Sequence, residues 1–153
     1  MSLKIGQTAP DFTLFDSEKQ KVTLSEQRGS KVILMFFPAA FTSTCTVQLC
    51  TMRDDLSWYN NLNAKVYGIS TDSLFVLAKY KESNNLNFQL LADFNKEVCG
   101  LYDAQYDEFV YGMKGVSKRA AFVIDENGKI LYAEVLDKAG DLPDFEKIKR
   151  CLD

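Results

Sequence analysis

The chain has 153 residues, a net charge of −3 and an apolar content of 46%, a composition typical of one globular domain, which we place at residues 1–153. It contains no histidine, which excludes Ser-His-Asp and Cys-His catalysis and the zinc, haem and iron sites that imidazole holds. It has neither an apolar run long enough to cross a bilayer nor a basic block, so we expect no membrane and no nucleic acid as partner.

The first part of the chain predicts a hairpin, a buried strand and a long helix. In chain order the expected elements are strands at 11–14 and 21–24, one helical turn at 25–29, a strand at 31–37 and a helix from about 43 to 60. The strand that begins at Lys31 is apolar after its first residue, as in a central strand covered on both faces. Pro38 ends this strand.

The rest of the chain predicts a βαβ continuation and a closing hairpin. In chain order the expected elements are a strand at 65–70, a helix capped by Ser73, a strand at 88–91, a short helix at 95–102, strands at 120–124 and 129–135, and a helix at 144–152. Asn127-Gly128 between the last two strands is a strong hairpin signal. This order predicts an α/β fold, with a mixed sheet and helices on both of its faces.

The cysteines are the main candidates for chemistry. They are Cys45, Cys50, Cys99 and Cys151, and they do not form the two C-x-x-C pairs of a structural zinc or iron–sulfur site. The first residues lack a hydrophobic signal core, so the expected compartment is the cytoplasm. Cysteines there that hold no metal are either buried as small apolar residues or redox-active.

Cys45 lies where a reactive thiol is expected. It follows the central strand and stands at or just inside the start of the next helix. Backbone N–H groups without an intrahelical partner and the positive end of the helix dipole are close to that position. Both favour the thiolate, which is the nucleophilic form, so we predict a reactive sulfur rather than a buried structural one.

The residues around Cys45 resemble the active site of a known family. The string Pro38-x-x-x-Thr42-x-x-Cys45 is similar to the PxxxTxxC motif of the peroxiredoxins. Residues 117–125 resemble the strand that carries the active-site arginine of that family, here Arg119.

The resemblance extends over nearly the whole chain. Residues 9–14 resemble the N-terminal strand of the family, and residues 45–54 its first long helix. Residues 39–42 together with Cys50 are most similar to the branch of the bacterioferritin comigratory proteins and the alkyl hydroperoxide reductase E type. Relatives with this cysteine spacing often carry Glu three residues after the reactive cysteine, where this chain has Gln48, which keeps an amide and lacks the charge.

The resemblance implies a thioredoxin-like fold with a central mixed sheet, flanking helices and an N-terminal β-hairpin extension. It implies a thiol-dependent peroxidase that reduces hydrogen peroxide and organic hydroperoxides with no metal or organic cofactor. A sulfenic acid on Cys45 would be resolved by Cys50 as an intramolecular disulfide, and a thioredoxin- or glutaredoxin-type protein would reduce that disulfide. A homodimer is implied as well, with Phe41 among the residues near its interface.

The same resemblance assigns roles around the sulfur. Arg119, the hydroxyl of Thr42 and the N–H of Cys45 would donate hydrogen bonds to the peroxide and stabilise its stretched O–O bond. Pro38 would shield the pocket from water and limit overoxidation. Strand alternation places Arg119 and Lys118 on opposite faces, which leaves Lys118 as the surface charge.

The resolving cysteine requires a conformational change. On one continuous helix the Cα atoms of Cys45 and Cys50 lie about 8.7 Å apart, whereas a disulfide needs less than about 7 Å. The first turns of the helix must therefore unwind before the bond forms. Cys50 as a core residue, and Cys99 or Cys151 as the resolving thiol, remain as alternatives.

Two other functions fit a reactive thiol. A thioredoxin-like disulfide reductase favours C-x-x-C at the helix start, and the C-x-x-x-x-C spacing of this chain disfavours it. A redox sensor or holdase would bind partners when oxidised and would consume peroxide slowly.

Overall fold

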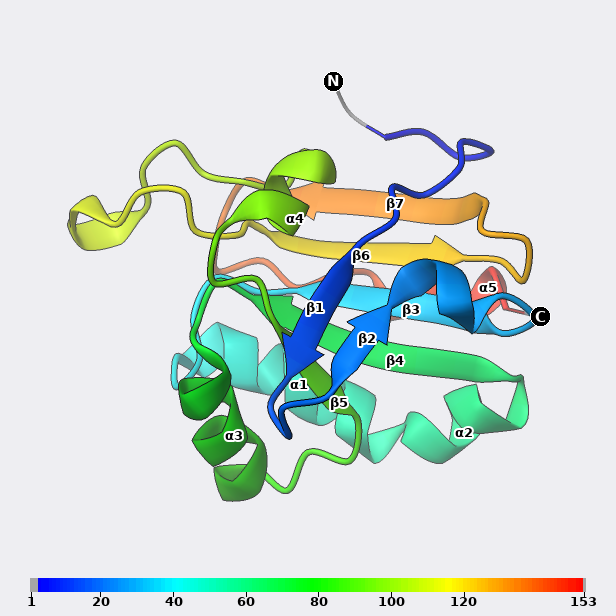
Figure 1. Ribbon diagram of the computed structural model, residues 1–153, viewed down its shortest axis with the longest axis horizontal. Coiled ribbons are helices and arrows are strands. Elements are labelled where there is room, and N and C mark those ends of the chain that lie inside the picture. Colours follow the sequence, from blue (N-terminus) through cyan, green and yellow to red (C-terminus); the bar gives the residue numbers. More distant parts are fainter. Residues whose placement is uncertain (1–2, 153) are drawn as a thin grey trace.

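The computed structural model describes residues 3–152 as a seven-stranded mixed sheet with helices on both faces (Figure 1). The strands are β1 (Thr13–Asp16), β2 (Lys21–Thr23), β3 (Lys31–Phe36), β4 (Ala64–Ser70), β5 (Gln89–Ala92), β6 (Arg119–Ile124) and β7 (Ile130–Leu136). Their order is β2-β1-β5-β4-β3-β6-β7. Strands β3, β4 and β5 run parallel, and the other pairs are antiparallel, so the predicted mixed sheet is confirmed.

The helices follow the predicted order. They are α1 (Ser43–Asp54), α2 (Leu56–Asn61), α3 (Leu74–Ser83), α4 (Glu97–Leu101) and α5 (Phe145–Arg150), with 3-10 turns η1 (Leu24–Gln27) and η2 (Val110–Gly112). Ser73 caps α3 as expected, because its hydroxyl accepts the N–H of Val76 at 3.3 Å. Within residues 3–152, none of these helices has the length and apolar character that a bilayer crossing requires.

The helix predicted from 43 to about 60 is two helices. The chain breaks at Asp55, whose φ of −102° and ψ of 8° leave the helical region. Asp54 and Asp55 stand at the carboxyl end of α1, where negative side chains oppose the helix dipole. The carboxylate of Asp55 instead pairs with the ammonium of Lys149 in α5 at 3.0 Å. The other predicted elements agree with the observed ones to within two residues at each end.

The alternation of β3 divides the core into two layers. Ile33 and Met35 pack with side chains from α1, α2, α3 and α5, while Leu34 and Phe36 pack with the N-terminal segment and α4. In the view of Figure 1 the β1–β2 end of the sheet lies in front of β3 and β4, and α1 lies behind them. The apolar run after Lys31 is therefore explained by burial on both faces of the strand, as predicted.

The pairing of β6 with β3 positions the candidate site residues. Because the two strands are antiparallel, with Phe36 opposite Ala120, the start of β6 lies beside the end of β3. The loop after β3 leads directly into α1. Arg119 at the start of β6 and Cys45 in α1 are therefore brought to the same end of the sheet.

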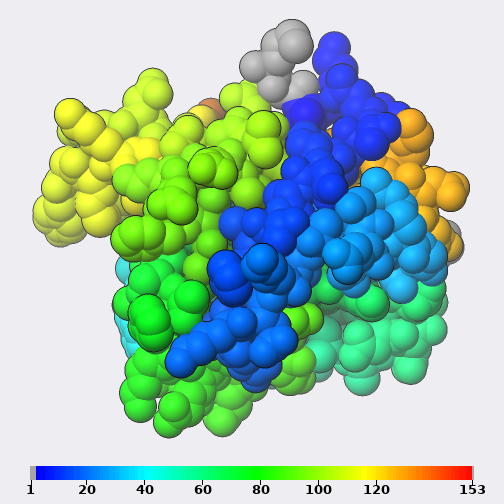
Figure 2. Space-filling model, viewed as in Figure 1, coloured from blue at the N-terminus to red at the C-terminus, as the bar shows by residue number. Residues whose placement is uncertain are grey.

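The segment between α4 and β6, residues 102–118, projects from the body of the molecule and contains η2. It is the yellow-green extension at the left of the ribbon and of the space-filling view (Figures 1 and 2). Backbone hydrogen bonds join its two arms, from Tyr106 N to Val116 O at 2.9 Å and from Gly115 N to Tyr106 O at 3.0 Å. We refer to residues 102–118 as the projecting loop.

Candidate active site

Cys45 lies in the first turn of α1, which begins at Ser43. The N–H groups of that turn have no acceptor within the helix. The residue is only 1% exposed, yet it lines a cavity of about 430 Å³ that opens beside the start of α1. A small molecule in this cavity would reach the sulfur without entering the core.

Arg119 is held against this sulfur. Its Nη1 lies 3.3 Å from Cys45 Sγ, and its Nη2 donates to the carbonyl of Ala139 at 2.8 Å. The arginine is 1% exposed, and its Nε is buried with no hydrogen-bond partner among the described residues. A fixed positive charge therefore faces the sulfur. Arg119 also lines the cavity beside the sulfur.

Gln48 completes the arrangement around the arginine. Its Oε1 accepts Nη1 of Arg119 at 2.7 Å, and its Nε2 donates to the carbonyl of Phe36 at 3.3 Å. Gln48 is fully buried, so the oxygen and the nitrogen of its amide both form hydrogen bonds inside the protein and neither contacts water. In the sequence, Gln48 stood out only for its missing charge. Its spacing of three residues from Cys45 already indicates the same helix face.

Thr42 occupies the N-cap position of α1 without capping it. Its hydroxyl donates to the carbonyl of Ala39 at 2.7 Å rather than accepting a helix N–H. Thr42 also lines the cavity, as does the buried ring of Pro38. In this arrangement the lone pairs of the Thr42 oxygen are open to a donor, whereas the expectation from the sequence was that the hydroxyl donates to the peroxide.

Asp72 holds the loop that precedes α1, a role that the sequence did not signal. Its Oδ2 accepts the N–H of Ala40 at 2.8 Å and the hydroxyl of Ser70 at 2.7 Å. The next residue, Phe41, has a φ of +64°, which is strained for a bulky side chain. The bond to Asp72 helps to keep this turn, and so the start of α1, in place.

Thr46 ties the start of α1 to α3. Its hydroxyl donates to the carbonyl of Thr42 at 2.8 Å and also lies 2.8 Å from the hydroxyl of Tyr80. Since a hydroxyl has one proton, Tyr80 is the donor in the second bond. Burial raises the pKa of Tyr80 to about 12, so the phenol keeps the proton that this bond needs at neutral pH.

The projecting loop forms one wall of the cavity. Phe109, Val110, Tyr111 and Met113 face the start of α1 across the opening. This wall was not predicted from the sequence, because the segment shows neither strand nor helix periodicity. Its only signal is a cluster of apolar residues outside any predicted element.

The other cysteines lie at different depths. All four thiols are free, and Cys50 is half-buried in α1, five positions after Cys45. Cys99 is buried on the opposite face of the sheet, where burial raises its pKa to about 12. Cys151 is half-buried, and burial raises its pKa as well. Cys50 is thus the half-buried thiol that shares a helix with Cys45.

Within the part of the chain that the structure describes, no three His, Cys, Asp or Glu side chains are grouped to bind a metal ion. The groups around the sulfur are a guanidinium, an amide, a hydroxyl and backbone atoms. Such an arrangement offers hydrogen bonds to a polar ligand beside the sulfur.

Comparison with known proteins relates this arrangement to a family. Residues 5–133 match the AhpC/TSA family. Peroxiredoxin Bcp of Escherichia coli is 37% identical over 130 residues, which cover 84% of this chain and 83% of the relative. Among solved structures, peroxidoxin BcpB from Mycobacterium tuberculosis is 30% identical and superposes with a TM-score of 0.83, covering 98% of this chain and 94% of the other.

A more distant structure supports the fold. A cysteine-to-serine mutant of PrxQ from Xylella fastidiosa is 22% identical and superposes with a TM-score of 0.87, covering 100% of this chain and 99% of the other. The thioredoxin-like fold that the sequence resemblance implied is therefore confirmed.

Proposed function

The chain belongs to the AhpC/TSA family of peroxiredoxins, which are thiol peroxidases, and from this premise we propose that Cys45 is the sulfur that reduces the peroxide. The observation that carries the proposal is the contact of 3.3 Å between Arg119 Nη1 and Cys45 Sγ in the first turn of a helix. A buried guanidinium stabilises a thiolate and leaves the sulfur facing a cavity.

The proposed reaction is a displacement at oxygen. The thiolate of Cys45 attacks the terminal oxygen of a hydroperoxide, an S–O bond forms, and the O–O bond breaks. The sulfur loses two electrons and becomes a sulfenic acid, while the leaving alkoxide or hydroxide takes a proton and departs as an alcohol or water. Thiols react in this way without metal or organic cofactor, and we propose none.

Ionisation of the sulfur is too small an effect to account for such a reaction. A thiol with an ordinary pKa of about 8.5 is only a few per cent ionised at pH 7, so full ionisation raises the thiolate concentration by roughly 30-fold. A more acidic sulfur is also a weaker nucleophile, which lowers the rate by about tenfold. The larger contribution must come from fixed donors that stabilise the breaking O–O bond. Arg119 is suited to this role, because it lies against the sulfur at the cavity and a guanidinium presents several donors in a rigid fork.

Thr42 and Pro38 complete the proposed pocket. The Thr42 oxygen can accept the O–H of a hydroperoxide while its own O–H donates to the carbonyl of Ala39, and the N–H of Cys45 adds a donor at the helix start. The ring of Pro38, which has no N–H, covers the side of the pocket against water.

Cys50 is the proposed resolving thiol. It would attack the sulfenic acid sulfur, forming the disulfide with Cys45 and releasing water. Both cysteines lie in α1, where their separation is too large for a bond, so α1 must unwind over its first turns. Cys99 is a poorer candidate, since it lies beyond the sheet and its raised pKa keeps it protonated.

The cycle closes when a thioredoxin- or glutaredoxin-type dithiol reduces the disulfide. We place the protein in the cytoplasm, where cysteines such as these four stay reduced between turnovers. We also propose a homodimer, supported by exposed aromatic side chains near the active-site loop, Phe41, Phe75 and Phe94. Sedimentation analysis of Phe75→Ser against the parent chain tests this arrangement.

The central experiment is mass spectrometry after one equivalent of peroxide. The parent chain should lose two hydrogens and yield a peptide that links Cys45 to Cys50. Cys50→Ser should instead gain one oxygen on Cys45, which a sulfenate-specific reagent captures. Cys151→Ser, which alters another half-buried thiol, is the matched control and should behave as the parent does. Oxidation at another cysteine, or none at all, would overturn the proposal.

A further inference from the structure

A second cavity opens at the place where β5 is shorter than β4. Strand β5 pairs with β4 only from Tyr67 opposite Gln89 onward, so the first residues of β4, Ala64–Val66, have no strand of the described chain beside them on that side. The space left there has a volume of about 310 Å³ and is bounded by β4, the start of β5, α2 and α3. We call it the β4 notch, and the lining residues that matter below are Lys65, Val66, Tyr67, Lys81, Asn87 and Phe88. It shares no lining residue with the cavity at Cys45.

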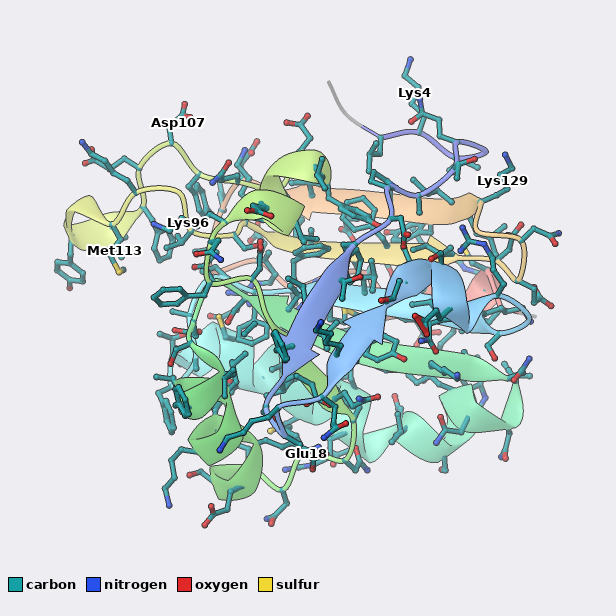
Figure 3. All side chains as sticks on the ribbon, in the orientation of Figure 1. Lys4, Glu18, Lys96, Asp107, Met113 and Lys129 are labelled. Atoms are coloured by element: carbon teal, nitrogen blue, oxygen red, sulfur yellow. The ribbon has the colours of Figure 1, made fainter. Side chains whose placement is uncertain are left out.

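The charged side chains of the β4 notch are both positive. Lys65 and Lys81 line it, and no carboxylate does. The ammonium of Lys65 donates to Gln27 Oε1 at 2.9 Å, which leaves two of its three N–H donors. Nζ of Lys81 is 3.6 Å from the carboxylate of Glu18, beyond hydrogen-bond distance, and Figure 3 shows Glu18 on the turn of the β1–β2 hairpin at the lower edge of the molecule. Both ammonium groups can therefore bind an anion.

Tyr67 brings a hydroxyl without a partner to the same notch. The residue is only 4% exposed, and its hydroxyl forms no hydrogen bond with a described residue. Burial raises the pKa of Tyr67, so the phenol keeps its proton at neutral pH and remains a donor. In a residue this deeply buried, a polar group without a protein partner points to a ligand or a water as the missing acceptor.

The remaining lining adds one more donor and an apolar surface. The amide nitrogen of Asn87 donates to the carbonyl of Arg53 at 3.2 Å, which fixes the amide and leaves its second N–H. Val66 and Phe88 are buried, and with the half-buried Leu56 they form the apolar part of the notch. The volume lies at the lower end of the range of roughly 300–1,000 Å³ that is usual for organic ligands. An inorganic ion would leave this apolar part uncovered.

We propose that the β4 notch binds a small organic oxyanion, a carboxylate or phosphate monoester joined to an apolar group. The oxyanion lies between the ammonium groups of Lys65 and Lys81 and accepts the O–H of Tyr67. The apolar group covers Val66 and Phe88. Because the notch and the cavity at Cys45 have no residue in common, this inference does not depend on the proposed function.

The first test is isothermal titration calorimetry on the reduced full chain with four probes. Phenyl phosphate and benzoate carry both halves of the ligand and should bind saturably, and the tighter of the two identifies the acid group. Inorganic phosphate lacks the apolar half and benzyl alcohol lacks the charge, so each should bind about tenfold more weakly or less. No saturable binding of either acid, or equal affinity for phenyl phosphate and either partial probe, would overturn the inference.

Two lysine variants locate the charge that binds the acid. Lys81→Gln and Lys79→Gln form a matched pair, because both lysines lie in α3 and pair with a glutamate, at 3.6 and 3.5 Å, while Lys79 lies outside the notch. Lys81→Gln should raise the dissociation constant about tenfold, the scale of a hydrogen bond to a charged group. Lys79→Gln should leave it at the parent value. An equal loss in both variants would show attraction by net charge alone and would refute a defined site.

A tyrosine pair tests the hydroxyl. The hydroxyls of Tyr67 and Tyr59 both have no partner among the described residues, and Tyr67 lines the notch whereas Tyr59 does not. Tyr67→Phe should weaken binding about tenfold without lowering the unfolding temperature, and Tyr59→Phe should bind as the parent does. An unchanged dissociation constant in Tyr67→Phe would contradict the proposed contact.

Resonance shifts place the ligand on the molecule. On titration with the tighter acid, the backbone amide signals of Lys65, Tyr67 and Asn87 should move, and those of Cys45 and Arg119 should stay. The reverse pattern would assign the binding to the cavity at Cys45 and overturn the inference. These readouts need no turnover, so a chain that fails to reduce peroxide but binds the acid would reject the proposed function and keep this site.

Discussion

Tyr80→Phe is expected to speed the formation of the Cys45–Cys50 disulfide. Five side-chain hydrogen bonds hold the first turns of α1 against the rest of the described chain, and four of them involve Arg119 or Gln48. The fifth joins Thr46 to Tyr80 at 2.8 Å. Only this bond can be removed without touching the groups that face the sulfur, so it isolates the unwinding step from the chemistry.

The magnitude follows from the worth of one hydrogen bond. Thr46 keeps its bond to the carbonyl of Thr42 when the phenol is removed, so the loss is one net bond, about 0.5–1.5 kcal/mol. The unwound form of α1 then becomes roughly 2- to 13-fold more populated. If unwinding is a rapid equilibrium that precedes disulfide formation, the disulfide forms faster by the same factor.

The assay is quench flow with alkylation and mass spectrometry. Sulfenate formation on Cys45 should stay within about twofold of the parent rate, since Tyr80 lies outside the groups that line the cavity. Disulfide formation should accelerate, and the yield of sulfinic acid at high peroxide should fall, because resolution competes with overoxidation.

Tyr59→Phe is the matched control. Tyr59 is fully buried like Tyr80, but its hydroxyl has no hydrogen-bond partner among the described residues. Removing it should leave both rates unchanged and raise the free energy of unfolding by about 1 kcal/mol. A disulfide rate in Tyr80→Phe equal to that in Tyr59→Phe, or a slower sulfenate step in Tyr80→Phe alone, would refute the reasoning.

Three further predictions address the site and the core. Arg119→Met should slow sulfenate formation by roughly 100- to 1,000-fold, the cost of one fixed donor at a developing charge, and Thr42→Val should also slow this step, both measured by stopped flow. Cys99, whose raised pKa of about 12 keeps it a neutral thiol below that pH, should resist iodoacetamide at pH 8 and react only after denaturation. Gly68→Ala should lower the free energy of unfolding by about 1–3 kcal/mol in urea titration, because an added Cβ would lie 2.7 Å from Leu90 Cδ2.

Local patterns in the sequence were sufficient for most of the elements and for the position of Cys45 at a helix start. The apolar run after Lys31 and the turn at Asn127-Gly128 each depend on neighbours in the chain, and both elements formed as predicted. The position of Cys45 at a helix start follows from the same local information. The break at Asp55 was missed because the helical pattern continues on both sides of the two adjacent aspartates.

Long-range features needed either the family resemblance or the structure. Arg119 and Cys45 are 74 positions apart, and no local pattern indicates that β6 pairs beside β3. The resemblance singled out Arg119, but the bonds to Gln48 and Ala139 that orient it became visible only in three dimensions. The apolar wall of the projecting loop lacks a periodic signal because its residues are placed by tertiary contacts.

The turn after β7 has a mechanical consequence. Asp137 anchors the projecting loop through Tyr106 and Lys118, and two residues later the carbonyl of Ala139 holds the guanidinium of Arg119. A ligand that displaces the projecting loop would therefore also displace residues 137–139, the backbone segment that orients the guanidinium of Arg119. The position of the projecting loop and the orientation of Arg119 therefore depend on the same turn, so a change in one is expected to alter the other.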